Sequence, residues 1–346
     1  MNDDNNGRKS AKISVIGSGS WGTAMAVMLA ENGHKITLWS YLEKEREDLE
    51  KYRENKPFLP GISIPESVIF TNSLEFCAED ADIIITATPS HAMRTTARNM
   101  SPYVKDGQLI LNISKGLEEE TYYTMSRVIA EEIPNCEIAV MSGPSHAEEV
   151  SRGIPTTNVV AAKRSETAEY IQDIIMNPNF RVYTNPDILG VELGGSLKNV
   201  IALCAGILDG MGLGDNTKAA LMTRGLVEMA RLGEAMGAKP ETFNGLSGMG
   251  DLIVTCTSMH SRNRRAGILI GKGKTVEEAQ KEVKMVVEGV KTCKAAKELA
   301  DKAGVEMPIV SEAYKALFEG MPAREAVVNL MGRAKKHESE KSFLGA

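Results

Sequence analysis

The sequence predicts an α/β protein in which a doubly wound parallel sheet is followed by an all-helical domain. Two observations support this prediction. Short apolar runs alternate with helical patterns from about Lys12 to Ala162, as in sheets that are covered by helices on both faces. After about Pro186 the strand-like runs disappear and long helical patterns follow. We therefore expect domains over residues 10–187 and 188–335, and a polar tail over residues 336–346.

Six apolar runs of strand length, rich in Ile and Val, make up the predicted sheet. In chain order they are KISVIG, HKITLW, ADIIITAT, GQLILNIS, EIAVMSG and TNVVAA. Because continuous apolar strands separated by helices are typical of parallel sheets, we expect ligands at the carboxyl ends of these strands. The segment of residues 52–68 carries three prolines and interrupts the alternation. We interpret it as a surface excursion between the second strand and the next.

The second half of the chain shows helical periodicity without strand patterns. The predicted helices cover residues 189–208, 216–236, 275–284, 289–303, 309–318 and 323–334. The longest apolar run covers residues 200–208, which is shorter than the roughly 18 residues that indicate a membrane-spanning helix. The pattern therefore predicts a helical domain rather than a membrane segment.

Composition limits the classes of protein that the chain can represent. Its 346 residues carry a net charge of −6, which argues against a nucleic-acid surface because such surfaces need a basic face. The five cysteines are far apart and form no C-x-x-C pair, which indicates reduced thiols rather than disulfides or a thiolate metal site. The polar start of the chain lacks the apolar core of a signal peptide. We therefore expect a cytoplasmic protein.

A glycine-rich turn joins the first predicted strand to the first predicted helix. Its residues are Gly17, Ser18, Gly19, Ser20, Trp21 and Gly22. A G-x-G-x-x-G spacing between a strand and a helix is typical of dinucleotide-binding Rossmann domains, in which the turn and the helix amino terminus hold the pyrophosphate. The alternative is a glycine-rich turn that binds no ligand. The strand, the helix and the position of the turn favour the nucleotide.

The expected cofactor is NAD or NADP, and the residues after the second strand leave the choice open. An NAD enzyme usually has an acidic residue here, which holds the ribose hydroxyls and repels a 2′-phosphate. This chain has Ser40 and Tyr41 instead. Ser40 is a candidate partner for a phosphate, Tyr41 for the adenine, and Lys44 or Arg46 for supplying charge. A solvated helix face explains the same charged stretch, so tolerance of NADP follows but preference for it does not.

Polar residues follow three of the predicted strands, where the ligands of such sheets collect. Lys115 follows the fourth strand, and Gly143 with Pro144 shapes a turn that presents Ser145 after the fifth. We expect these residues to contact cofactor or substrate. For Lys115 the alternative is a solvated loop lysine. His146 lies in the same turn, and we interpret it as structural because a lone loop histidine is more often structural than catalytic.

Lys198 is the strongest candidate for catalysis. It is the only charged residue in the apolar stretch 193–208, and Asn199 follows it. Burial disfavours an ammonium and lowers its pKa towards neutrality, as a general acid or base for carbonyl chemistry requires. Gly194 and Gly195 allow a ligand or another backbone to approach closely. The alternative is a lysine whose ammonium reaches solvent at the end of its aliphatic stem.

A second polar group follows a glycine-rich approach in the helical half. Its members are Asp251, Thr255, Arg262, Asn263, Arg264 and Arg265. Arginine forks are well suited to gripping phosphates and planar anions. Three arginines alone often form only a surface patch, but here they accompany a nucleotide fold and two candidate lysines. We therefore expect a phosphorylated substrate.

Six stretches of the chain together resemble one enzyme family. They read VIGSGSWGTA, NISKGLE, SGPSHAEEV, ELGGSLKNVIALCAGI, GLSGMGDLIVTC and SRNRRAG. Between about residues 12 and 333 the chain resembles the bacterial type of NAD(P)-dependent sn-glycerol-3-phosphate dehydrogenase. The resemblance implies reversible reduction of dihydroxyacetone phosphate, which supplies the glycerophospholipid backbone. It also implies a helical domain like the carboxy-terminal domain of 6-phosphogluconate dehydrogenase, and a homodimer.

The resemblance also implies roles for individual residues. Lys198 matches the proton donor and acceptor, and Lys115 matches the lysine near both cofactor and substrate. The substrate-binding positions are Gly143, Ser145, Asp251, Ser261, Arg262 and Asn263, with Asn199 and Thr255 lining the site. The cofactor-binding positions are Ser20, Trp21, Ala147, Arg262, Val286 and Glu288. Ser40 and Tyr41 depart from the family, which often has a basic residue or histidine there.

In the expected mechanism Lys198 protonates the alkoxide, and Lys115 and Asp251 orient this lysine and the substrate hydroxyl. No metal is expected, because an ammonium can stabilise the alkoxide charge. Two other functions fit parts of the pattern. One is a two-domain dehydrogenase for a 3-hydroxy acid or a sugar acid, against which the SRNRRAG cluster argues. The other is a nucleotide-binding sensor, which has no use for Lys115 and Lys198.

Overall fold

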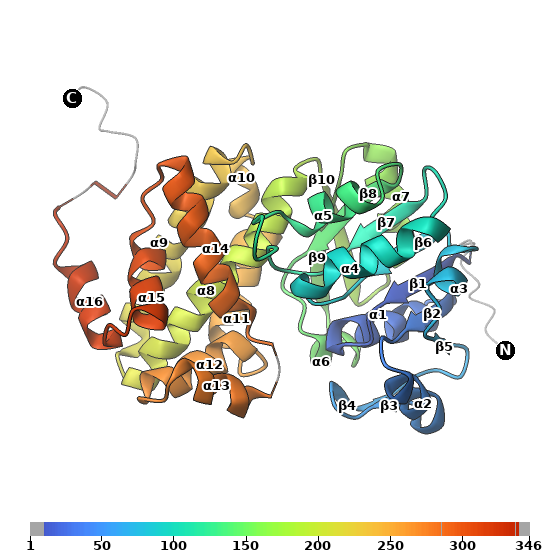
Figure 1. Ribbon diagram of the computed structural model, residues 1–346, viewed down its shortest axis with the longest axis horizontal. Helices are drawn as coiled ribbons and strands as arrows, with labels where there is room; N and C mark the ends of the chain where they lie inside the picture. The colour runs from blue at the N-terminus through green and yellow to red at the C-terminus, as the bar shows by residue number, and fades with distance from the viewer. Residues whose placement is uncertain (1–9, 285, 336, 339–346) are drawn as a thin grey trace.

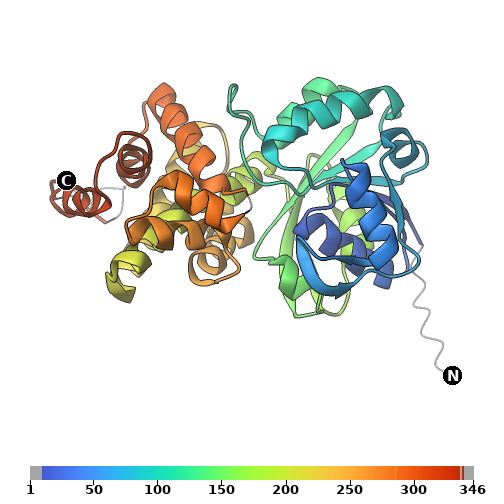
Figure 2. The same ribbon diagram turned by 60° about the horizontal axis from the view of Figure 1, so that its bottom comes forward.

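The computed structural model of the protein describes residues 10–284, 286–335 and 337–338. Figures 1 and 2 show two parts of the molecule side by side: one contains the sheet and the helices that cover it, and the other contains helices alone. The last strand ends at Asn185, and the first helix of the second half begins at Ile188. The α/β half therefore precedes the all-helical half, as predicted. Of the predicted polar tail, all residues except 337 and 338 lie outside the described part of the chain.

The described residues form an eight-stranded sheet with the strand order β10-β9-β8-β7-β6-β1-β2-β5, and a separate ribbon of β3 and β4. The strands are β1 (Lys12–Ile16), β2 (Lys35–Trp39), β3 (Glu54–Asn55), β4 (Leu59–Ser63), β5 (Ile69–Thr71), β6 (Ile83–Thr86), β7 (Leu109–Asn112), β8 (Glu137–Ser142), β9 (Thr156–Ala162) and β10 (Phe180–Asn185). The chain builds the sheet outward from β1 to β5, then returns to β6 on the other side of β1. Sheets of this kind bind their ligands at such a switch point.

Helices cover both faces of the sheet. They are α1 (Ser20–Glu31), α2 (Glu43–Tyr52), α3 (Leu74–Ala78), α4 (Ser90–Met100), η1 (Ser101–Tyr103), α5 (Met125–Glu132), α6 (Ala147–Val150) and α7 (Ser165–Ile175). Buried side chains of α1, α6 and α7 pack in one core, and those of α3, α4 and α5 pack in another. Along β6, Ile83 and Ile85 belong to the first core and Ile84 to the second. Both faces of the sheet are therefore buried, as its continuous apolar strands indicate.

The sheet differs from the sequence prediction in direction and in strand number. The six predicted strands are present and the sheet is mostly parallel, as predicted, but β8 and β9 pair antiparallel. The connection between these strands forms only the four-residue helix α6. A helix this short does not carry the chain back across the sheet, as a parallel crossover requires. β5 and β10 are additional strands, and β10 escapes prediction because half of its residues are exposed.

The predicted surface excursion at residues 52–68 has structure of its own. β3 and β4 pair as an antiparallel ribbon beside α2. Asn55 of this ribbon is buried, and its Nδ2 atom donates hydrogen bonds to the Ser18 carbonyl and to Thr23 Oγ1, both at 2.7 Å. The excursion therefore supports the glycine turn from one side.

The described residues of the second half form no strand. Its helices are α8 (Ile188–Met211), α9 (Gly214–Ala235), α10 (Pro240–Phe243), the π-helical turn η2 (Leu246–Gly250), α11 (Asp251–Thr257), α12 (Arg262–Gly271), α13 (Val276–Val283), α14 (Glu288–Ala303), α15 (Pro308–Phe318) and α16 (Ala323–Met331). The six predicted helices correspond to α8, α9 and α13 to α16. The segments from α10 to α12 are additional, and two of them carry candidate site residues.

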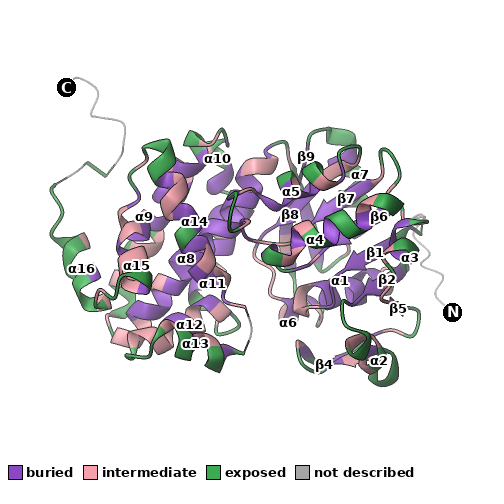
Figure 3. Cartoon of the chain, viewed as in Figure 1, coloured by how far each residue is buried: buried purple, intermediate pink, exposed green. Residues whose placement is uncertain are grey.

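α8 is the central helix of this half and is buried along most of its length (Figure 3). α9, α11, α12 and α14 pack against it. Among the described helices, α8 is the one that is long and apolar enough to cross a membrane, but 89% of its apolar window is buried inside the protein. Its hydrophobicity is therefore explained by its place in the core.

α8 and α12 touch each other backbone to backbone. Gly206 and Gly210 of α8 lie against Gly267 and Gly271 of α12. A Cβ atom added at Gly206 would lie 2.1 Å from the Arg264 carbonyl oxygen, and one added at Gly271 would lie 2.2 Å from the Ile207 carbonyl oxygen. Because side chains set the distance between packed helices, this approach requires glycine. The contact holds the amino end of α12 beside the middle of α8.

Candidate active site

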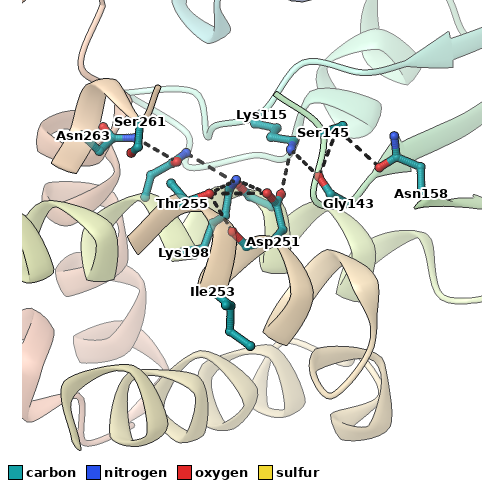
Figure 4. Close-up of polar contacts among 12 residues, drawn as sticks. Lys115, Gly143, Ser145, Asn158, Lys198, Asp251, Ile253, Thr255, Ser261 and Asn263 are labelled. Atoms are coloured by element: carbon teal, nitrogen blue, oxygen red, sulfur yellow. Dashed lines mark hydrogen bonds and ion pairs between the residues drawn. The ribbon is translucent and has the colours of Figure 1, made fainter. Parts of the chain in front are cut away.

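The buried residues Lys198 and Asp251 form an ionic cluster with the half-buried Lys115 (Figure 4). Asp251 lies between the two lysines: its Oδ1 accepts a hydrogen bond from Lys198 Nζ, and its Oδ2 accepts one from Lys115 Nζ at 2.6 Å. Asp251 is 1% exposed and Lys198 is 5% exposed. Buried charges are tolerated where they are paired, and here two cations share one carboxylate. The three residues come from α8, from the loop after β7 and from the start of α11.

Thr255 completes the surroundings of the Lys198 amine. Its Oγ1 accepts a hydrogen bond from Lys198 Nζ at 2.7 Å and donates one to the Asp251 main-chain oxygen at 2.6 Å. Since Thr255 follows Asp251 by one turn of α11, both side chains lie on the same face of the helix. These contacts use two of the three N–H donors of an ammonium. Within the described part of the chain no hydrogen bond engages the third, which is available to a substrate oxygen.

The surroundings of the cluster shift the pKa values of Lys198 and Asp251 by different causes. Burial, aided by the charge of Lys115 and opposed by Asp251, lowers the pKa of Lys198 to about 7. Burial acts to raise the pKa of Asp251, but Lys115 and Lys198 outweigh it and hold this pKa below its usual value. Asp251 therefore stays ionised at neutral pH while Lys198 gains and loses its proton. A general acid or base works best with a pKa near the ambient pH.

A chain of hydrogen bonds beside the cluster joins three helices. Asn263 Nδ2 donates to Asn199 Oδ1 at 2.9 Å, and the Gly289 N–H donates to Asn263 Oδ1 at 2.8 Å. Ser261 caps α12, since its Oγ accepts a hydrogen bond from the Arg264 N–H at 3.2 Å. The amino end of α12 is thereby held next to α8 and α14, with Asn199 adjacent to Lys198 in the sequence.

The three arginines of the predicted phosphate grip have different surroundings. Arg262 is the first residue of α12, and its guanidinium makes no hydrogen bond or ion pair with another described residue. Arg264 instead pairs with Asp209 of α8 at 2.8 Å. Arg265 Nε is buried without a partner among the described residues. Arg264 is therefore engaged within the helical half, whereas Arg262 keeps its donors for a ligand.

Residues after α13 approach the same region from the helical half. Burial raises the pKa of Glu288, although Ser90 Oγ donates a hydrogen bond to its Oε2 at 3.0 Å. Ser90 begins α4, so this bond links the sheet half to the helical half. Burial lowers the pKa of Arg262, and the charge of Glu288 opposes that effect. Val286, two residues before Glu288, is half-buried.

The turn after β8 lies against the ionic cluster. Gly143 has a φ of +154°, and a Cβ atom there would lie 2.2 Å from Asn158 Oδ1, so the position requires glycine. The Gly143 carbonyl accepts hydrogen bonds from Lys115 Nζ at 3.2 Å and from Ser145 Oγ at 3.0 Å. Ala147, a few residues on, is buried at the start of α6.

His146 lies in the same turn and packs against His260 of the helical half, with 5.6 Å between the ring centroids. Its Nε2 is buried and has no partner among the described residues. Burial lowers the pKa of His146, and the charge of Lys198 adds to this effect. The histidine therefore lies near the cluster as a neutral ring.

The glycine turn after β1 fits a dinucleotide. Gly17 has a φ of +121°, and a Cβ atom at Gly22 would lie 2.0 Å from the Gly17 carbonyl oxygen. A Cβ atom at Gly19 would meet nothing within 4 Å, so the backbone is open to a ligand there. α1 begins with Ser20 and Trp21 and has no acidic residue in its first turn. Its amino terminus therefore keeps the partial positive charge that attracts a pyrophosphate.

Family models match both halves of the chain. The model described as NAD-dependent glycerol-3-phosphate dehydrogenase N-terminus matches residues 12–168, and the one described as the C-terminus matches residues 187–328. The chain belongs to this family.

Individual members of the glycerol-3-phosphate dehydrogenase family are similar over almost the whole chain. A glycerol-3-phosphate dehydrogenase (NAD(P)+) from Fusobacterium nucleatum is 56% identical over 329 residues, which are 94% of this chain and 98% of that protein. The enzyme of the same name from Agathobacter rectalis is 55% identical over 328 residues, 95% of this chain and 98% of that protein. A glycerol-3-phosphate dehydrogenase structure from Coxiella burnetii has a TM-score of 0.90 and 37% identity, over 94% of this chain and 99% of that one.

The name of these family members includes both NAD and NADP. After β2, this chain offers little unpaired positive charge that could bind the 2′-phosphate of NADP. Ser40 is fully buried, and its hydroxyl has no partner among the described residues. It therefore does not line a phosphate pocket, in contrast to one sequence expectation. Lys44 and Arg46 are each ion-paired with acidic residues of their own helix, α2. Tyr41 is 76% exposed, so it is available to a bound nucleotide.

Several buried residues that the sequence predictions do not include support the candidate active site. Asn55 supports the glycine turn, Asn158 lies behind the Gly143 turn, and Asn112 with Glu192 lies behind Lys115. A detectable signal exists for two of them, since Asn112 and Asn158 each interrupt an apolar strand run. Glu192 directly precedes the apolar stretch that contains Lys198.

Proposed function

We propose that this protein catalyses the reversible, NAD(P)H-dependent reduction of dihydroxyacetone phosphate to sn-glycerol 3-phosphate. The observation that carries the proposal is the Lys198–Asp251–Lys115 ionic cluster in a chain of the glycerol-3-phosphate dehydrogenase family. Residues 10–187 form the proposed dinucleotide domain, and residues 188–335 form the domain that supplies most substrate contacts.

Lys198 is the proposed proton donor. The Gly17–Gly22 turn would hold NAD(P)H, which would supply a hydride for the C2 carbonyl of the substrate. As this carbonyl becomes an alkoxide, Lys198 Nζ donates a proton to its oxygen and becomes a neutral amine. In the reverse direction the amine accepts the hydroxyl proton. Asp251 and Thr255 hold Nζ in place, and Lys115 adds positive charge that stabilises the oxyanion.

Arg262 and Asn263 are the proposed partners of the substrate phosphate. Arg262 is half-buried, and its guanidinium has no ion-pair partner in the described chain. Such a group can bind a phosphate through two parallel hydrogen bonds. Asn199, Ser261, Gly143 and Ser145 are the further proposed substrate contacts. The proposed cofactor contacts are Gly17, Ser18, Gly19, Ser20, Trp21, Gly22, Tyr41, Lys115, Ala147, Arg262, Val286 and Glu288.

The proposed product enters glycerophospholipid synthesis, and we propose that the enzyme is a cytoplasmic homodimer. The resemblance to bacterial enzymes supports these points. Light scattering of the purified protein measures the dimer directly, and a monomer mass would refute it.

The proposed activity is tested by the loss of NADPH or NADH absorbance in the presence of dihydroxyacetone phosphate. We expect oxidation of the cofactor at a rate that saturates with this substrate. A panel of 3-hydroxy acids and sugar acids, run in the oxidative direction, is the comparison. Turnover of that panel without turnover of dihydroxyacetone phosphate would show a different dehydrogenase, and cofactor binding without any turnover would show a sensor.

The pH dependence of the reaction is expected to follow Lys198. In carbonyl reduction kcat/KM falls as the pH rises through about 7, because only the ammonium form donates a proton. In alcohol oxidation it rises through the same pH, because only the neutral amine accepts one. The neighbours of this amine are Lys115, Asp251, Cys256 and His146. Burial raises the pKa of Cys256 to about 12, and those of Asp251 and His146 are lowered.

Glu228 provides the control for this profile. Burial raises the pKa of Glu228 to about 7 as well, but its carboxylate lies at the start of α15, where the Ile309 N–H donates to it at 2.8 Å. Glu228→Gln is expected to leave the profile unchanged. A midpoint near the ordinary lysine value of about 10.4, or one that disappears in Glu228→Gln, would remove the assignment to Lys198.

Cofactor preference is expected to respond to a positive charge at the end of β2. The wild type is expected to use NADPH and NADH with similar kcat/KM values, since Lys44 and Arg46, the first two cations after this strand, are both ion-paired. Tyr41→Arg is expected to shift the ratio towards NADPH by about tenfold, the effect of one charged hydrogen bond to the 2′-phosphate. Tyr52→Arg, at the far end of α2, is the control. An unchanged ratio in Tyr41→Arg would place the ribose phosphate elsewhere.

A further inference from the structure

Glu192 of α8 is a buried carboxylate that reaches into the sheet half. It lies six residues before Lys198 and is 7% exposed. Its Oε1 accepts hydrogen bonds from the Ser126 N–H at 2.9 Å and from Asn112 Nδ2 at 3.2 Å, and its Oε2 accepts one from Ser126 Oγ at 2.5 Å. Ser126 is in the first turn of α5, so Glu192 caps that helix from outside. Asn112 is the last residue of β7.

Asn112 in turn shapes the loop that carries Lys115. Its Oδ1 accepts a hydrogen bond from the Ser114 N–H at 3.1 Å, and its Nδ2 also donates to the Ser114 carbonyl at 3.2 Å. The Asn112 side chain is 1% exposed, so no solvent replaces these partners. The carboxylate of Glu192 therefore contacts the one side chain that holds both main-chain groups of the residue before Lys115.

Ser196, one turn after Glu192, holds the other side of the same loop. Its Oγ accepts a hydrogen bond from the Gly116 N–H at 2.9 Å and donates one to the Gly116 carbonyl at 3.2 Å. Gly116 has a φ of +140°, a backbone conformation that glycine adopts readily and other residues rarely do. Between these two residues Gly195 lies close to Lys115, whose Cγ would be 3.6 Å from an added Cβ atom.

A single helix thus carries the loop contacts and the proposed proton donor. A helix rises about 1.5 Å per residue, so Glu192 and Lys198 are about 9 Å apart along the axis of α8. Lys115 and Lys198 reach opposite oxygens of Asp251. The spacing between the two ammonium groups therefore depends on how the 112–116 loop is fastened to α8.

We propose that Glu192 and Ser196 are positioning residues for the reaction, which hold the Lys115 loop on α8 so that Lys115 stands opposite Lys198 across Asp251. This inference rests on the proposed function. It assigns the two residues no contact with substrate or cofactor. Their effect on turnover passes through the place of Lys115, whose charge helps to lower the pKa of Lys198.

The proposal predicts a linked change in rate and in pH profile. Glu192→Ala is expected to lower kcat for dihydroxyacetone phosphate by roughly tenfold to a hundredfold, the loss associated with displacement of a reacting group by about 1 Å. The pH midpoint of glycerol 3-phosphate oxidation is expected to move upward, because the withdrawn Lys115 no longer opposes protonation of Lys198. Glu192→Gln keeps an acceptor for Ser126 and Asn112 and is expected to restore both properties.

Two further variants make the result decisive. Glu228→Ala is the matched control, because Glu228 is also buried and also accepts main-chain N–H groups at a helix start, but touches no part of the Lys115 loop. It is expected to lower the melting temperature while leaving kcat and the pH midpoint unchanged. Should Glu192→Ala fail to fold, Ser196→Ala removes a single oxygen atom and carries the same test, with a several-fold loss of kcat and an upward midpoint.

The outcomes separate this inference from the proposed function. Absence of wild-type turnover with dihydroxyacetone phosphate would overturn the function and the inference together. Wild-type turnover with a stable Glu192→Ala or Ser196→Ala variant whose kcat and midpoint match the wild type would overturn the inference alone. A parallel loss of kcat in Glu228→Ala would overturn it too, since general destabilisation would then explain the effect.

Discussion

Lys198→Met is expected to lower kcat for dihydroxyacetone phosphate by about a thousandfold, within the range lost when a general acid is removed. Methionine has a similar length and fills the space between Asp251 and Thr255 without a proton to give. Asp251 keeps Lys115 as a partner, so its buried carboxylate is not left uncompensated. Steady-state turnover and a cofactor-binding titration together measure the effect. Binding of NADPH is expected to stay near the wild-type value.

Lys218→Met provides the matched control for this experiment. Lys218 is also a mostly buried, ion-paired lysine of the helical half, but its partner is Asp209, at 2.6 Å. Its loss is expected to affect stability and not turnover. Near-normal kcat in Lys198→Met would refute the proton-donor assignment, and weakened NADPH binding of similar size would indicate a cofactor contact instead.

Arg262→Ala is expected to raise KM for dihydroxyacetone phosphate by roughly tenfold to a hundredfold. Hydrogen bonds to charged groups contribute about 1.5–3 kcal/mol, and the half-buried Arg262 guanidinium, which has no ion-pair partner in the described chain, has its donors free for the phosphate. kcat is expected to change less than KM, because the phosphate is bound in both the ground state and the transition state. Saturation curves for the substrate at fixed NADPH measure the two constants separately.

Arg264→Ala is the control, since Arg264 lies two residues further along α12 and is engaged with Asp209. It is expected to leave KM unchanged. Dihydroxyacetone without the phosphate is the second comparison, and its slow turnover is expected to be the same in Arg262→Ala and the wild type. A comparable loss with this unphosphorylated compound would show that Arg262 acts on something other than the phosphate.

The parts of the fold that are predictable from sequence are those with strong periodicity. The six apolar strand runs, the glycine turn and the six helical patterns of the second half all correspond to features of the structure. Lys198 can be identified as a candidate from the sequence because a single charged residue in a long apolar helix rarely has a purely structural role. Its position beside Asp251 is expected from the family resemblance but not from the local pattern, since the packing of α11 on α8 brings the two residues together.

The remaining elements lack a local signal. α11 has only seven residues, and α12 begins with the polar run RNRR, so their apolar periodicity is weak. β10 alternates between buried and exposed residues and pairs only with β9. The direction of β9 depends on a four-residue helix rather than on the strand itself. Such features are decided by tertiary contacts, which override local preference.

The glycine contact between α8 and α12 fixes the distance between the two ends of the proposed substrate site. Lys198 lies on α8 and Arg262 on α12. Contacts between main-chain atoms, rather than between side chains, set the distance between these two helices. Where side chains separate two helices, a change of rotamer can make room for a longer molecule. Where the two backbones are in contact, no side chain can move to widen the space. We therefore expect tolerance for changes at the carbonyl end of a substrate, and intolerance for an extra carbon between that carbonyl and the phosphate.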